Sequence, residues 1–270
     1  MALTETRPET AGTPASGPER PAPGPLERLI GSGDHTAIGR LFIGFSLVLT
    51  AVTLITLAVV GVDRASDNGF LGDRTGMLGT SSLVALVLLG AVPLLLGLAI
   101  AVVSFQLGSP AIAFPRAAAL SLWSWLASAA IFITSVALNR GTRGARTDAA
   151  RLGNVSMGAM MVALGLGAVC VATTVMAHRP PGMRLALAPM FSWASLVGAS
   201  LWIVTLGAAV AHVVLGQVMH SDASGLAENF TSGLAWLLRG PSIYVFAIPV
   251  RGIVADALAT ATGRRIAQYG

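Results

Sequence analysis

This 270-residue chain contains no lysine, a single cysteine and few charged side chains of either sign. Charged residues make up 11% of the sequence and hydrophobic residues 54%, and the mean hydropathy is +0.75. An ordinary water-soluble domain carries about 25% charged residues. The composition therefore excludes that class and indicates a protein embedded in membrane lipid.

The scarcity of cysteine and lysine excludes further kinds of site. Cys170 is the only cysteine and lies in an apolar run, so neither an intramolecular disulfide nor a thiolate metal cluster is possible within the chain. All 17 basic residues are arginines. They lie in loops, tails and the ends of apolar runs and form no basic stripe with interleaved aromatic residues, so we expect no nucleic-acid partner.

Long apolar runs are what the sequence has instead. A helix needs about 20 mostly apolar residues to cross a bilayer, and the runs predict an all-α fold, a polytopic membrane bundle of six transmembrane helices. They cover about Ile38–Val62, Ser82–Leu107, Ala117–Leu138, Val155–Ala177, Phe191–Met219 and Gly233–Ala259. We expect the last span to be broken, because Arg239, Pro241 and Pro249 interrupt it.

The chain divides into three parts by composition. Residues 1–34 are rich in Pro, Gly, Glu, Thr and Ala, which predicts a disordered tail. Residues 35–265 form the six-helix membrane domain, and residues 266–270 form the C-terminal end. An even number of spans places both termini on one side of the membrane. That side carries more arginines than the other, so we expect both termini in the cytoplasm.

Four short motifs lie in or next to these spans. DHTAIGRLF begins at Asp34, GSPAIAFPR covers Gly108–Arg116, RPPGM covers Arg179–Met183, and RGPSIYVFAIP covers Arg239–Pro249. Taken together, they resemble motifs in the first half of the heme-copper oxidase catalytic subunit, cytochrome c oxidase subunit I. The resemblance extends over about residues 35–265. It implies the fold of six of that family's twelve core helices.

The departures from the family pattern concern its cofactor ligands. A family histidine of helix two binds heme and one of helix six binds copper, and the corresponding positions here are Ser82 and Gly240. Neither a hydroxyl nor a bare Cα replaces imidazole on iron or copper. The carboxylates of the family's proton channel correspond to Ala111 and Ser242. The resemblance therefore implies a chain with no heme, no copper and no catalytic residue of its own.

Two polar residues in the predicted spans remain as candidates. His212 lies in the fifth span, where an ionisable group suggests a functional role, although a neutral histidine hydrogen-bonded to a neighbouring helix is the simpler interpretation. Tyr244 falls on the family tyrosine that is linked to a copper ligand. Because Gly240 removes that partner, we expect the Tyr244 hydroxyl to be satisfied inside the bundle. Glycines of the fourth and fifth spans, Gly198 among them, predict close helix packing.

These observations lead to two functional hypotheses. The first is an accessory, structural or assembly component of a respiratory oxidase in the bacterial cytoplasmic membrane. It would act by packing, through its broken sixth span, in a homo-oligomer or against other respiratory subunits. The alternative is one half of a split catalytic subunit, which transfers electrons to oxygen once a separate chain completes it. A transporter or channel is disfavoured, because we expect the spans to lack the carboxylates and paired charges that mark ion pathways.

Overall fold

The computed structural model describes residues 34–66, 69–138, 147–180, 182–218 and 226–263. Within these residues the chain has no strand and six helices that are long and apolar enough to cross a membrane. This confirms the predicted all-α membrane bundle. Apart from Asp34, the predicted tail lies outside the described residues, as does the predicted C-terminal end.

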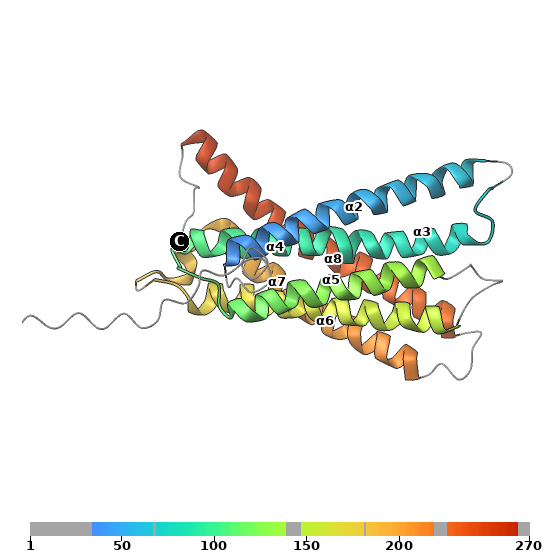
Figure 1. Ribbon diagram of the computed structural model, residues 1–270. Coiled ribbons are helices and arrows are strands. Elements are labelled where there is room, and N and C mark those ends of the chain that lie inside the picture. The colour runs from blue at the N-terminus through green and yellow to red at the C-terminus, as the bar shows by residue number, and fades with distance from the viewer. Residues whose placement is uncertain (1–33, 67–68, 139–146, 181, 219–225, 264–270) are drawn as a thin grey trace, which may run out of the picture.

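The helices run back and forth along one bundle (Figure 1). Their bounds are α2 His35–Ala65, α3 Arg74–Ala85, a π-helical segment Leu86–Ala91, α4 Val92–Gln106, α5 Pro115–Leu138, α6 Thr147–Ala177, α7 Met190–Val218 and α8 Leu226–Thr262. A short 3-10 turn, Leu185–Leu187, precedes α7. The beginning of α2 and the end of α8 lie at the same end of the bundle (Figure 1), as expected for an even number of spans.

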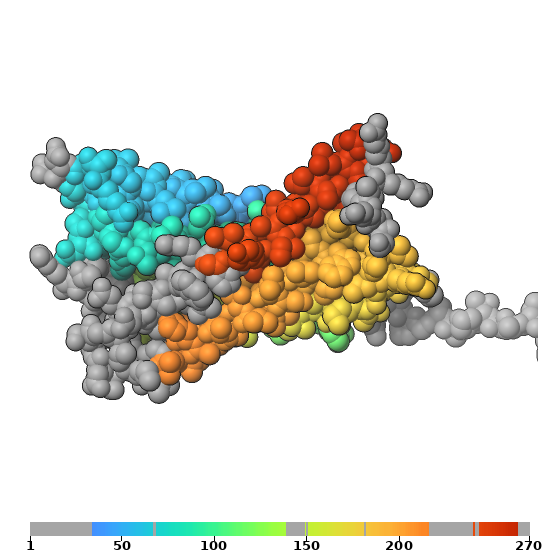
Figure 2. All heavy atoms as spheres, turned by 180° about the vertical axis from the view of Figure 1, so that it is seen from behind, coloured from blue at the N-terminus to red at the C-terminus, as the bar shows by residue number. Residues whose placement is uncertain are grey.

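Consecutive helices pack side by side from α5 to α8, while α2 packs against α3 and α4. The central element is α4, which also touches α6, α7 and α8. From behind, α8 lies across α7 and diverges from α2, so that a notch opens between α2 and α8 (Figure 2). In consequence, α8 is held mainly by α7.

Carboxylates fix both ends of α2. Asp34 is its N-cap, and its Oδ1 accepts a hydrogen bond from the Thr36 backbone N–H at 2.9 Å. Asp63, in the last turn, is 4% exposed. It accepts from the Leu71 backbone N–H at 2.7 Å and from the Thr75 hydroxyl. Asp63 therefore ties the connection after α2 and the start of α3 back onto the helix it ends.

The second span starts earlier than predicted and contains a π-helical segment. It runs continuously from Arg74 to Gln106, and the Val92 N–H donates to the carbonyl of Val87, five residues earlier. In this register the Leu88 carbonyl faces Pro93, which has no N–H to donate. The indole N–H of Trp125 on α5 supplies the missing donor at 3.0 Å. One buried tryptophan therefore satisfies the carbonyl that the proline leaves free.

The predicted break in the sixth span is wrong, because α8 is helical from Leu226 to Thr262 through both prolines. A proline removes one hydrogen bond and needs room for its ring. Gly198 on α7 provides that room: a Cβ built there would lie 2.8 Å from the Cγ of Pro249. The missing side chain of Gly198 therefore accommodates the proline, and α8 stays continuous.

The predicted close packing at glycines is confirmed, but within this chain. A Cβ at Gly165 on α6 would lie 3.3 Å from Cδ1 of Leu206 on α7, and a Cβ at Gly158 would lie 3.3 Å from Cγ1 of Val213. Together with Gly198 and Pro249, these contacts join α6, α7 and α8 to one another. These glycines, together with Pro249 of the span that was expected to contact a partner, thus face neighbouring helices of the same chain.

Candidate functional site

The positions that the resemblance assigns to ligands and proton carriers are spread over separate elements. Ser82 is buried on α3, Ala111 is partly buried in the connection between α4 and α5, and Gly240 is partly buried on α8. The side chain of Ser242 lies outside the described residues. Because α3 packs against α2 whereas α8 packs mainly against α7, Ser82 and Gly240 belong to different helix pairs.

The histidines are equally dispersed. His35 begins α2, His178 follows the end of α6, and His212 lies on α7. His212 is partly buried and interacts with other groups of the chain. Across the described ranges, no three His, Cys, Asp or Glu side chains lie close enough together to hold a metal ion.

Tyr244 does not lie where it was expected. Its side chain is 67% exposed on α8, whereas that of the next residue, Val245, is buried at 6% exposure. The helical turn explains the difference, because successive side chains point about 100° apart and only Val245 faces the bundle. The expectation that the Tyr244 hydroxyl is satisfied inside the bundle is therefore wrong.

Tyr244 belongs to an exposed apolar surface that we call the outer face of α8. Its members are large side chains that point away from α7: Ile243, Tyr244, Val250, Val254 and Leu258. Apart from the phenol hydroxyl of Tyr244, these side chains are hydrocarbon. The outer face can therefore contact either acyl chains or another apolar helix.

Sequence reasoning missed a polar cluster around Asp256. One oxygen of this carboxylate, on α8, accepts hydrogen bonds from Gln106 Nε2 at 2.9 Å and from the Phe191 backbone N–H at 3.0 Å. The Ser192 hydroxyl donates to Gln106 Oε1 at 2.7 Å. The cluster joins the end of α4, the start of α7 and α8. Because the first N–H groups of a helix have no partner within that helix, Asp256 caps α7 from a neighbouring helix.

The statement that the predicted spans lack carboxylates is therefore wrong. Asp256 lies within the predicted sixth span, three residues before Ala259. The signal was present in the sequence: a single acidic residue among apolar ones near the end of a span. What the sequence could not provide was the partner, since Gln106 is 150 positions away.

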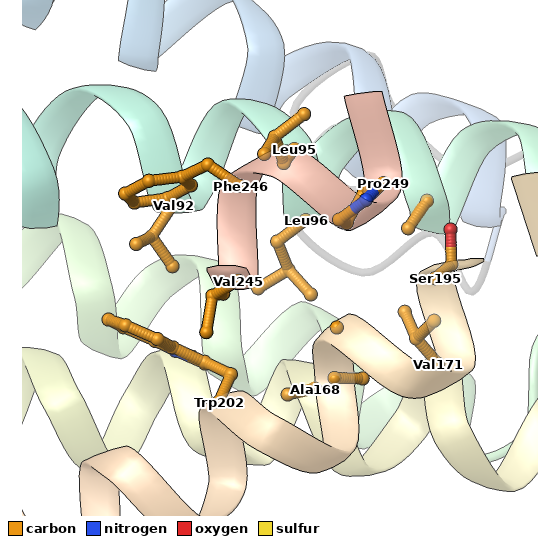
Figure 3. Close-up of a pocket in the computed structure, with 13 residues that line it drawn as sticks. Val92, Leu95, Leu96, Ala168, Val171, Ser195, Trp202, Val245, Phe246 and Pro249 are labelled. Carbon is orange, nitrogen blue, oxygen red and sulfur yellow. The ribbon is translucent and has the colours of Figure 1, made fainter. Parts of the chain in front are cut away.

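A small cavity lies farther along the same helices, between α4, α6, α7 and α8 (Figure 3). Its volume is about 50 Å³. Ser195, Gly198 and Trp202 line it from α7, at spacings of three and four residues that place them on one helix face. Val245 and Pro249 line it from α8. Except at Ser195 and Trp202, the lining side chains are hydrocarbon.

A family model and individual relatives were compared with this chain, and all of them point to the same family of respiratory oxidase subunits. The family model described as cytochrome c and quinol oxidase polypeptide I matches residues 37–270. The chain is 27% identical over 263 residues to a putative cytochrome c oxidase subunit 1-beta of Streptomyces avermitilis, covering 87% of this chain and 46% of that protein. It is 30% identical over 264 residues to the heme-copper oxidase subunit I+III of Aeropyrum pernix, covering 88% and 32%.

A third relative is cytochrome c oxidase subunit 1 of Bacillus sp. (strain PS3), 26% identical over 261 residues, covering 87% of this chain and 42% of that protein. The chain spans less than half the length of each of these relatives. The family model, in contrast, matches most of this chain, including every described helix except the first two residues of α2. The chain therefore belongs to the heme-copper oxidase subunit I family and corresponds to the N-terminal region of that subunit.

Proposed function

We propose that this chain is an accessory or assembly component of a respiratory oxidase that acts through helix packing and holds neither heme nor copper. The observation that carries the proposal is the pair of residues at the positions of the family's second-helix and sixth-helix ligands. These residues are Ser82 and Gly240.

The residues present do not fit the family's cofactors at these positions. Heme iron and copper take imidazole, thiolate, thioether or, for some hemes, phenolate donors. Gly240 has no side chain to donate an electron pair, and the hydroxyl of Ser82 is a weak neutral ligand. Ala111 cannot carry a proton, because its methyl group has no polar atom.

The outer face of α8 is the surface that we assign to a partner, and the partner we expect is another membrane helix. Acyl chains match the hydrocarbon side chains of this face, but they leave the Tyr244 hydroxyl without a hydrogen-bond partner. A neighbouring helix can contact the hydrocarbon side chains and also provide a hydrogen-bond partner for the Tyr244 hydroxyl, because it offers apolar side chains together with polar groups. The continuation of subunit I in the relatives beyond the matched length is one source of such a helix.

An optical spectrum with metal analysis tests the absence of cofactors. The protein is purified in mild detergent with its partners attached, and the chains are then separated. We expect no stoichiometric heme or copper on this chain. A reduced-minus-oxidised spectrum with an α-band equivalent to one heme per chain contradicts the proposal.

Photo-crosslinking tests the packing surface. A photoreactive amino acid is placed at Val254 on the outer face of α8 and, as the matched control, at Val48 on α2, which is also highly exposed. We expect a protein adduct from position 254 and only lipid adducts from position 48. Mass spectrometry of the adduct separates an accessory role from a split catalytic subunit, because the latter requires a partner with the family's later helices and their histidines. Lipid adducts alone at position 254 contradict the packing role.

We also propose that both termini face the cytoplasm. The two described ends of the chain lie at one end of the bundle (Figure 1), and the arginine bias favours the cytoplasmic side for that end. Accessibility labelling of Arg20→Cys in a Cys170→Ala background tests the orientation. Labelling from the periplasmic side alone contradicts it.

A further inference from the structure

The cavity between α4, α6, α7 and α8 contains two polar groups that the rest of the described chain leaves unpaired. The Ser195 hydroxyl and the Trp202 indole N–H are buried, at 4% and 2% exposure. Neither has a hydrogen-bond partner within the described residues. Both side chains line the cavity (Figure 3). An unpaired buried donor is costly, so each of these groups points to an occupant that can accept a hydrogen bond.

A third polar group faces the same space from α8. Pro249 has no N–H, so the carbonyl of Val245, four residues earlier, lacks its helical donor. This carbonyl lies beside Gly198, because a Cβ built on that glycine would be 3.5 Å from the Val245 oxygen. The cavity thus brings together two donors from α7 and one acceptor from α8.

The positions along α7 determine how an occupant is arranged. Ser195 and Trp202 are seven residues apart on one face, which is about 10 Å at the rise of an α-helix. Gly198 lies between them, so the Val245 carbonyl lies beside a position on α7 that is about one turn from each of the two residues. A water molecule between the two helices can accept a hydrogen bond from a donor on α7 and donate one to the carbonyl on α8, with each hydrogen bond about 2.8 Å long.

We propose that this cavity is a water-binding site that holds at least two ordered water molecules. One accepts from the Ser195 hydroxyl, the other accepts from the Trp202 indole, and both donate to the two lone pairs of the Val245 carbonyl. The volume of about 50 Å³ is sufficient, because one water needs about 10–15 Å³ measured in this way. A purely apolar occupant leaves all three polar groups unpaired. The inference does not depend on the proposed function.

This hydration accounts for a proline in the middle of a membrane helix. Backbone groups freed by proline are tolerated within a bilayer where side chains or ordered waters satisfy them. The structure provides such a place, since Gly198 accommodates the Pro249 ring and the cavity beside it accommodates the waters. The seam between α7 and α8 is therefore partly hydrated, although hydrocarbon side chains surround it.

Radiolytic hydroxyl labelling tests the site, because radicals generated from bound water oxidise the side chains next to that water. The full chain is irradiated in lipid nanodiscs and the oxidation of each tryptophan is measured by mass spectrometry. The internal control is Trp125, which is 0% exposed and whose indole N–H is already paired with the Leu88 carbonyl. We expect Trp202 to be oxidised severalfold faster than Trp125.

A cavity-filling variant links this oxidation to the cavity. Ala199 lines it, so Ala199→Leu is expected to reduce Trp202 oxidation to the level of Trp125. If that variant does not fold, Ser195→Ala, which removes one of the anchoring groups, is expected to lower the oxidation in the same direction. Trp202 oxidation no faster than that of Trp125 overturns the proposal. So does rapid oxidation that persists in the filled variant, or xenon binding that the filled variant abolishes, since xenon marks a dry cavity.

Discussion

Replacing Asp256 with alanine is expected to destabilise the fold far more than its partly exposed position on α8 suggests. The substitution removes the acceptor of two hydrogen bonds. Hydrogen bonds to a charged group contribute about 1.5–3 kcal/mol each. The Gln106 amide is partly exposed and can find another partner, whereas the Phe191 N–H belongs to a residue that is 3% exposed. We therefore expect a loss of about 2–4 kcal/mol in the free energy of unfolding.

Two further variants make this prediction specific. Asp256→Asn keeps a carbonyl oxygen at the same place, so it is expected to cost only about 1 kcal/mol. Thr260→Ala, one turn later on α8, removes a hydroxyl that donates only to carbonyls of its own helix. It is expected to stay within about 0.5 kcal/mol of the wild type.

The assay combines unfolding in mixed micelles with amide hydrogen exchange at the start of α7. In Asp256→Ala, the Phe191 amide is expected to lose protection even under conditions where the rest of α7 keeps it. Equal effects of the alanine and asparagine variants, or unchanged protection of Phe191, would refute the reasoning that Asp256 caps α7.

Four other substitutions have expected outcomes that equilibrium unfolding can check. On α7, Gly198→Ala is expected to destabilise by about 1–3 kcal/mol, because its Cβ would lie 2.8 Å from a Pro249 carbon. Gly207→Ala has only open space to fill and is expected to stabilise by about 0.5–1 kcal/mol; the same sign for both would contradict the packing described. Trp125→Phe is expected to cost about 1–3 kcal/mol, since it leaves a buried carbonyl of the π segment unpaired. Asp34→Ala is expected to cost about 0.5–2 kcal/mol as a lost N-cap. Hydrogen bonds from Thr36 hold the pKa of Asp34 below its ordinary value of 3.8, so this contribution is fully present above about pH 4 and is lost as the pH falls through the lowered pKa. Urea titrations at a series of acidic pH values check it, and a difference between Asp34→Ala and wild type that grows as the pH falls counts against it.

The apolar runs predicted the number and order of the spans because length and hydropathy are local properties. The ends of the spans were predicted less well, because they depend on contacts with residues elsewhere in the chain. Arg74 begins the second span eight residues before the predicted start at Ser82, in a segment where Asp63 fixes the preceding connection through Leu71 and Thr75. No property of residues 74–81 alone reveals that contact.

The sixth span was also predicted incorrectly because of contacts with another helix. Two prolines predicted a break, yet the helix continues. At Pro249 the reason lies on another helix, because Gly198 lacks a Cβ at the place where the proline ring lies. Tyr244 was assigned to the interior from its family position, yet the direction of its side chain depends on which face of α8 contacts α7. Both errors concern contacts between helices, which a single sequence does not encode at the level of individual residues.

The π-helical segment Leu86–Ala91 has a consequence for how residues in this family are matched with one another. A π turn accommodates one residue more than the α-helix it interrupts. A relative whose second helix is regular therefore pairs with this chain in one register before the segment and in another after it. Ser82 lies before the segment. The residue of the relative that is matched with Ser82 in one register is therefore matched with a neighbour of Ser82 in the other. The neighbours of Ser82 are Ser81 and Leu83, and neither carries an imidazole. The proposal that this chain lacks a heme ligand at this position therefore does not depend on the register in which the chains are superimposed.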